Sequence, residues 1–128
     1  MKGFEWVKAK MESQQFSDCK YLEYHLMHSD LLDDDGIYPT DEALEIIERW
    51  PMFQNKELFE FIHGLWYMRE WGWHEEEIEG GTRYSISTAG WSGNESLIHA
   101  LERNHTFAWA TTWYQSRRGG HYIFEVKD

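Results

Sequence analysis

A turn of small residues at positions 89–94 has the composition of an anion-binding loop. The pattern predicts a strand before this turn and a helix after it, and the free N–H groups at a helix start favour anions. A second glycine-rich turn, at 116–120, carries two arginines, whose guanidinium groups bind phosphate or carboxylate through paired hydrogen bonds. If the two turns are neighbours, they can clamp a small phosphorylated ligand such as a nucleotide. The residues of this predicted ligand site are Trp91, Ser92, Gly93, Asn94, Arg117, Arg118 and His121.

The same turns also have a purely structural interpretation. Glycine suits the backbone geometry of turns, Ser92 suits a helix N-cap with Glu95 completing a capping box, and turn arginines are commonly exposed. Neither a Walker loop nor the dinucleotide motif GxGxxG is present. The sequence therefore leaves the ligand site and the structural interpretation both open.

Histidines and aspartates in the first part of the chain have some of the spacing that metal sites use. His25 and His28 lie three residues apart and can share one face of a helix, with Asp30 or Asp33 as an oxygen ligand. The acidic turn 33–36 imitates a calcium loop, but its first position would be Leu31, which cannot coordinate calcium. Surface histidines and an acidic turn explain the same residues, so we predict no metal and no cofactor.

No arrangement of nucleophilic residues predicts an enzyme. The motif GxSxG is absent, and the only cysteine, Cys19, has no reactive sequence context. The run 74–77 beside Trp71 and Trp73 could serve acid–base chemistry if one carboxylate were desolvated. An exposed strand face or a tryptophan-rich recognition surface explains the same run. We therefore assign no catalytic residue and favour a binding protein.

The charge of the chain is strongly acidic and unevenly distributed. The formal net charge is −11; residues 1–80 carry 7 basic and 19 acidic side chains, whereas residues 81–128 carry 5 and 4. Direct binding to a nucleic-acid backbone needs a basic patch, which the first 80 residues lack. An acidic surface of this kind either keeps the protein in solution or binds a basic groove on another protein.

The composition predicts a single globular domain in the cytoplasm. Aromatic residues make up 17% of the 128 residues, enough to build one core. We find neither an apolar segment of about 20 residues that could cross a membrane nor a secretory signal. The single cysteine excludes an intramolecular disulfide.

The hydrophobic periodicity is helical up to about residue 70 and alternates afterwards. We predict an α+β fold in one domain, 1–128, in which a helical acidic half, 1–70, packs on a largely antiparallel four-stranded sheet. The half from 71 to 128 has the order β-β-α-β-β, and the order of strands within the sheet is not predicted. The predicted helices cover residues 4–14, 18–28, 41–50, 55–70 and 92–103, and the predicted strands cover 73–78, 82–88, 105–115 and 122–126.

Three stretches of the chain resemble a group of small proteins from bacteriophages and prophages. They are ISTAGWSGNE at 86–95, SRRGGHYIFE at 116–125 and DGIYPTDEAL at 35–44. The resemblance implies a bacterial host cytoplasm and an accessory role, and it implies no particular activity or residue role.

Together these observations favour a non-catalytic phage-type accessory protein that binds a host protein. An acidic inhibitor of a defence protein or a nucleic-acid-handling protein fits the charge of the first half. The alternative is a binder of a small phosphorylated or nucleotide ligand through residues 90–94 with Arg117 and Arg118. We expect no direct contact with nucleic acid or membrane, and the sequence does not predict the oligomeric state.

Overall fold

The computed structural model describes residues 31–128. The predicted helices at 4–14 and 18–28, the histidine pair His25 and His28, Asp30 and Cys19 lie outside the described residues. The helices are α3 (Asp41–Glu48), α4 (Asn55–Leu65), α5 (Arg69–Gly72), α6 (Ser92–Glu102) and α7 (Ala108–Thr112). The strands are β1 (Trp73–Ile78), β2 (Gly81–Ser87), β3 (Trp113–Arg117) and β4 (His121–Lys127).

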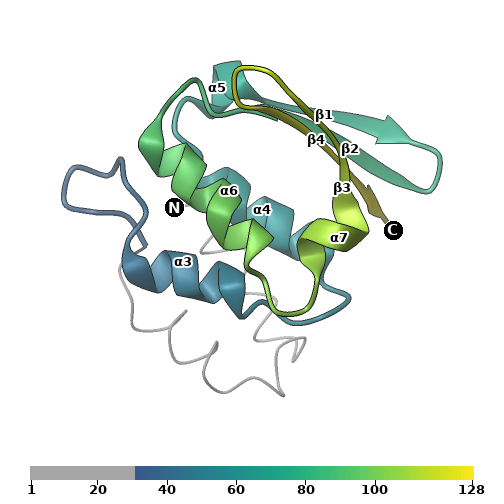
Figure 1. Ribbon diagram of the computed structural model, residues 1–128, viewed down its shortest axis with the longest axis horizontal. Helices are drawn as coiled ribbons and strands as arrows, with labels where there is room; N and C mark the ends of the chain where they lie inside the picture. The colour runs from purple at the N-terminus through teal and green to yellow at the C-terminus, as the bar shows by residue number, and fades with distance from the viewer. Residues whose placement is uncertain (1–30) are drawn as a thin grey trace.

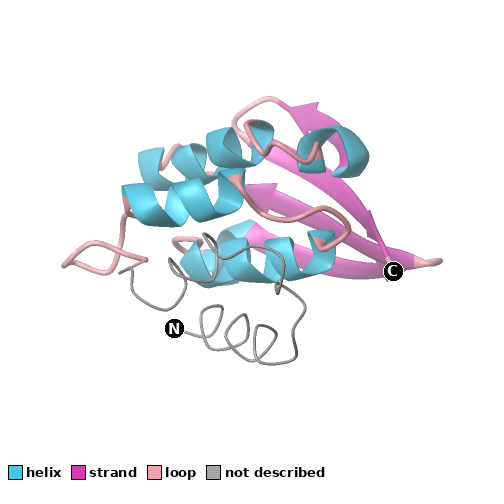
Figure 2. Ribbon diagram, turned by 90° about the horizontal axis from the view of Figure 1, so that it is seen from below, coloured by secondary structure: helices cyan, strands magenta, loops and turns pink. Residues whose placement is uncertain are grey.

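The four strands form one antiparallel sheet in the order β1-β2-β4-β3, which confirms the predicted α+β class. In the register of the central pair, Tyr84 lies opposite Phe124 and Arg83 lies opposite Glu125. Because side chains alternate along a strand, the aromatic pair faces the helices and the charged pair faces away. The helices gather on one side of the sheet (Figures 1 and 2).

Helix α4 is the central helix, as its apolar periodicity predicts. Phe59 stacks on Tyr84 of β2 with a centroid distance of 4.8 Å and contacts Phe124 of β4 at 5.2 Å. All three side chains are almost fully buried. Fully burying one such ring contributes about 1.5–3 kcal/mol, so this contact fixes α4 over the middle of the sheet.

Helix α4 ends earlier than the predicted boundary at residue 70. Trp66 leaves the helix with an extended backbone, because its ring packs against Trp73 and its indole N–H donates to the Ser87 carbonyl at 3.2 Å. The chain then turns through Met68, which has a left-handed φ of 58°, into the short α5.

The predicted N-cap of α6 is also wrong by one residue. Trp91 occupies the N-cap position with an extended backbone, no side chain caps the helix, and Ser92 is already helical. At α3, by contrast, the prediction is confirmed, because the Thr40 hydroxyl accepts a hydrogen bond from Ala43 N–H at 3.2 Å.

The predicted strand at 105–115 is wrong over most of its length. The structure has a loop, the helix α7 and only then the strand β3. The cause is Asn104, whose buried Oδ1 accepts hydrogen bonds from Thr106 and Ala108 N–H groups at 2.9 and 3.2 Å. Its Nδ2 donates to the Ile47 carbonyl at 2.7 Å, which ties the end of α6 to α3.

We predict that Asn104→Ala lowers the free energy of unfolding by about 3 kcal/mol, because it leaves several buried backbone groups without partners. Urea denaturation measures the change. The matched control is Asn55→Ala, which removes one exposed side-chain hydrogen bond to Thr111 and is expected to cost less than about 1 kcal/mol. An equal effect of the two substitutions would contradict the central role of Asn104.

Candidate functional site

The two turns of the predicted ligand site lie side by side. Thr88 N–H, at the end of β2, donates to the Gly120 carbonyl in the β3–β4 turn at 3.0 Å. Gly120 has a φ of +76°, and a Cβ there would lie 2.3 Å from the Thr88 hydroxyl oxygen. The approach of the two turns therefore depends on a glycine at this position.

The residues of the first turn are nevertheless committed to packing. The Trp91 ring is stacked between Tyr38 and Tyr67, with centroid distances of 5.1 and 4.6 Å. Asn94 is 1% exposed, and its side chain accepts from Tyr67 N–H at 2.9 Å and donates to the Tyr67 carbonyl at 3.0 Å. Gly93 lies against the rings of Trp91 and Tyr38. Of the four predicted ligand residues in this turn, only Ser92 is exposed.

The residues of the second turn lie on or beside the sheet face that points away from the helices. Arg117 lies opposite His121, which lies opposite Ser87 on β2. Arg117 Nε donates to Gln115. Burial, Arg117 and His74 together lower the pKa of His121. Arg118 is exposed and forms no ion pair within residues 31–128. The structure thus joins the two turns but divides their side chains between two faces.

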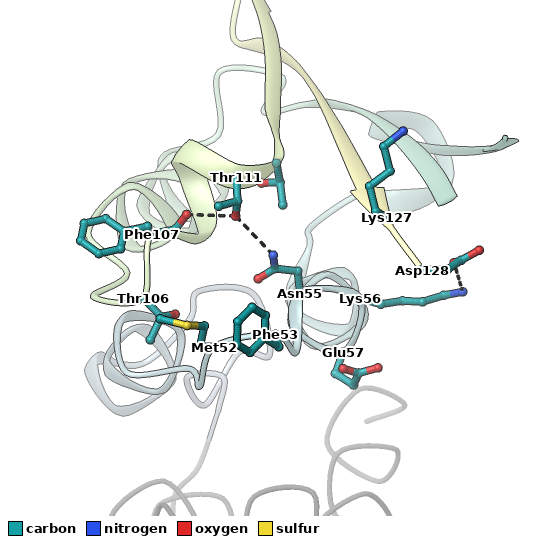
Figure 3. Close-up of a pocket in the computed structure, with 11 residues that line it drawn as sticks. Met52, Phe53, Asn55, Lys56, Glu57, Thr106, Phe107, Thr111, Lys127 and Asp128 are labelled. Carbon is teal, nitrogen blue, oxygen red and sulfur yellow. Dashed lines mark hydrogen bonds and ion pairs between the residues drawn. The ribbon is translucent and has the colours of Figure 1, made fainter. Parts of the chain in front are cut away.

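A cavity of about 590 Å³ lies at the other end of α4, where the sequence predicted no site. Five separate segments meet there: the α3–α4 loop, the first turn of α4, the α6–α7 loop, the end of α7 and the end of β4 (Figure 3). Its lining comprises Met52, Phe53, Asn55, Lys56, Glu57, Thr106, Phe107, Thr111, Thr112, Lys127 and Asp128. The sequence only indirectly indicates this cavity, because Phe53 fits no helical periodicity and Phe107 falls within the predicted strand at 105–115.

Two phenylalanines on this cavity have a backbone conformation that bulky residues rarely adopt. Phe53 has a φ of 66° and is 88% exposed, and Phe107 has a φ of 63° and is 68% exposed. A left-handed conformation costs a non-glycine residue about 1–2 kcal/mol. Within residues 31–128, neither ring is buried enough to offset this cost.

Polar contacts hold the floor of the cavity together. The Thr111 hydroxyl donates to the Phe107 carbonyl at 3.0 Å and lies 3.3 Å from the Asn55 side-chain nitrogen (Figure 3). Lys56 pairs with Asp128 at 3.5 Å, which connects the first turn of α4 to the end of β4. The cavity therefore combines three apolar side chains with polar residues that are held by hydrogen bonds and one ion pair.

Burial and three glutamates of α4 and β1 raise the pKa of the Tyr84 phenol. We call Glu57, Glu60 and Glu75 the acidic cluster. Glu75 lies opposite Tyr84 in the strand register, so their side chains share one face of the sheet. The Tyr84 hydroxyl is buried and has no hydrogen-bond partner. Burial, then Glu75, Glu60 and Glu57, raise the pKa of Tyr84.

The charge of the acidic cluster is only partly compensated, because Lys56 lowers the pKa of Glu60. None of its carboxylates forms an ion pair within the described part of the chain, and Lys56, the nearest cation along α4, pairs with Asp128. Burial and Glu75 raise the pKa of Glu60. Glu75 itself accepts a hydrogen bond from the Trp73 indole at 3.0 Å. Glu75 therefore disfavours the charged form of Glu60.

Comparisons with known proteins add no family to this description. A scan of family models, a search of curated proteins and a search of solved structures each gave no match. Within residues 31–128, no three His, Cys, Asp or Glu side chains are placed to hold a metal ion. No helix among those residues is long and apolar enough to span a membrane.

We predict that Arg117→Gln raises the pKa of His121, because the substitution removes one of the positive charges that oppose protonation. The folded state binds a proton at His121 less readily than the unfolded chain, so this residue destabilises the fold as the pH falls below about 6.5. An NMR titration of the imidazole measures the pKa. Arg118→Gln is the control, and an equal shift in both variants would contradict the placement of Arg117.

We predict that Tyr84→Phe raises the free energy of unfolding by about 1 kcal/mol, because a buried hydroxyl without a partner is costly. The ring stack with Phe59 is retained. Urea denaturation at pH 7 measures the change, and Tyr114→Phe, at an exposed ring, is the neutral control. Destabilisation by Tyr84→Phe would show that the hydroxyl has a partner.

Proposed function

We propose that this protein is a non-catalytic phage-type accessory protein that binds a host protein through the cavity at the start of α4. The observation that carries the proposal is the pair of exposed phenylalanines, Phe53 and Phe107, in left-handed backbone conformations on one cavity. Backbone strain of this kind clusters at functional sites, where the surrounding structure maintains it.

An apolar group of a partner protein would bury the two phenylalanine rings. This burial would offset the cost of their left-handed backbone conformation. Phe53, Phe107 and the half-exposed Met52 surround the cavity, and aromatic anchors of this type dominate the energetics of protein interfaces. Burying one such side chain contributes about 1.5–3 kcal/mol. The cavity is thus suited to an aliphatic or aromatic side chain of a partner protein.

The charge of the protein favours one class of partner. The net charge is −11, and Glu57, which forms no ion pair within residues 31–128, lines the cavity. A defence protein or a nucleic-acid-handling protein presents a basic groove for its own substrate. We therefore propose an acidic inhibitor of such a protein.

The alternative, a phosphorylated or nucleotide ligand at the adjacent turns, has less support. Both faces of the Trp91 ring are covered by tyrosines, and the Asn94 amide is used by Tyr67. A base could stack on Trp91 only by displacing a tyrosine. The ligand would depend mainly on Arg117, Arg118 and His121, with the exposed Ser92 as the remaining contact from the first turn.

We predict that the double variant Phe53→Asn/Phe107→Asn folds normally and no longer binds the partner protein. Asparagine adopts the left-handed conformation more readily than phenylalanine. The free energy of unfolding of the double variant should therefore be within about 1 kcal/mol of that of the parent. Native mass spectrometry after incubation with bacterial host extract identifies bound proteins. The prediction is a captured protein that the double variant no longer retains.

Met68→Asn is the matched control, because Met68 is also half-exposed and left-handed but lies beyond the opposite end of α4. It should retain the captured protein, and the complex should re-form from purified components. Loss of binding in Met68→Asn alone would move the docking surface to the α4–α5 turn. An added mass of nucleotide size, with no captured protein, would favour the ligand alternative.

A further inference from the structure

Two threonines that line the cavity at the start of α4 have already used their hydroxyl protons. The Thr106 hydroxyl lies 2.9 Å from the Trp50 carbonyl and 2.6 Å from the side-chain oxygen of Asn104. Both neighbours can only accept, so the Thr106 hydroxyl donates to them. In the same way, the Thr111 hydroxyl donates to the Phe107 carbonyl at 3.0 Å. The two hydroxyl oxygens can therefore offer only their lone pairs to another group.

Asn55 adds an acceptor to the wall of the cavity. Its side-chain nitrogen lies 3.3 Å from the Thr111 hydroxyl oxygen. Because the Thr111 proton is directed to a carbonyl, this oxygen accepts from Asn55, which fixes the orientation of the amide. The Asn55 side-chain oxygen is thereby turned away from Thr111 (Figure 3). No donor within residues 31–128 reaches it, and Asn55 is only half-buried, so a group in the cavity can donate to it.

The apolar part of the lining favours an aromatic occupant. The side chains of Met52, Phe53 and Phe107 border the cavity (Figure 3), and aromatic rings pack well against the edges and faces of other rings. The volume of about 590 Å³ exceeds what an aliphatic side chain fills, and unfilled space forfeits dispersion contacts. The best occupant is therefore a large aromatic group that also carries a hydrogen-bond donor.

We propose that the cavity binds the indole ring of a tryptophan presented by the partner protein, and that its N–H donates to the side-chain oxygen of Asn55. The indole N–H is a donor only, which matches a wall that offers acceptors. A phenylalanine would cover the Asn55 oxygen without replacing its bond to water, which is costly. A tyrosine carries a donor as well, but its single ring fills less of the cavity.

This inference rests on the proposed function for the source of the tryptophan, but the cavity is testable without the partner protein. The probe is N-acetyl-tryptophan amide, titrated into the full ¹⁵N-labelled chain. The comparison is N-acetyl-3-benzothienylalanine amide, in which sulfur replaces the N–H and the ring shape is nearly unchanged. We expect saturable shifts of the Asn55, Thr106 and Phe107 amide signals with both. The tryptophan probe should bind about threefold to tenfold more tightly, the range of one neutral hydrogen bond.

Single variants separate the hydrogen bond from the apolar contacts. Asn55→Leu removes the acceptor at similar volume, so it should bind the benzothienyl probe like the parent and reduce the preference for tryptophan to less than about twofold. The matched control is Gln54→Leu, which removes the neighbouring carboxamide, a group outside the lining of the cavity. This control should retain the full preference. Phe53→Asn/Phe107→Asn should weaken both probes by the same factor.

The proposal would be overturned by the absence of a saturable shift around the cavity or by equal affinity for the tryptophan and benzothienyl probes. A preference for tryptophan that persists in Asn55→Leu would also overturn it, as would tighter binding of N-acetyl-tyrosine amide. None of these measurements uses the host extract. Failure to capture a host protein therefore contradicts the proposed function alone, whereas the loss of the tryptophan preference contradicts this inference alone.

Discussion

The contact of Phe59 with Tyr84 and Phe124 is the constraint on which the other features depend. It places one helix over the two central strands, and everything on that helix is positioned relative to the sheet as a result. The residue after Phe59 is Glu60, which is thereby held beside β1. The first turn of α4 is held beside the end of β4, where Lys56 meets Asp128. The positions of the apolar core and of the acidic cluster therefore both depend on this one contact.

Much of the fold could be predicted because its signals are local. The periodicity of α3 and α4, the hairpin glycines and the alternation in β2 and β4 each involve residues close in sequence. The strand predicted at 105–115 failed because Asn104, one buried amide, satisfies backbone groups from two other segments and makes a helix possible there. Alternating side chains alone carry no information about such a long-range partner.

The candidate sites, too, depend partly on residues that are close in sequence and partly on residues that are far apart in sequence. The sequence left open whether the two glycine-rich turns are neighbours, and the hydrogen bond from Thr88 N–H to the Gly120 carbonyl places them side by side. That Trp91 and Asn94 are used for packing follows from Tyr67, which lies 27 residues before Asn94. The cavity was not predictable because it is built from five segments, and its strained phenylalanines are recognised only from backbone angles. The carboxylates of β1 were seen as an exposed run, but not the effect of Glu75 on Tyr84 and Glu60.

Strand β1 is an edge of the sheet, and its carboxylates discourage pairing with other chains. At the other end of the hairpin, Asp128 N–H donates to the Gly80 carbonyl at 2.9 Å while its carboxylate holds Lys56. A peptide fused after Asp128 would therefore leave the fold at the cavity itself. A polyhistidine tag in that place would compete with a partner for the cavity, whereas an environment-sensitive dye there would report directly whether the cavity is occupied.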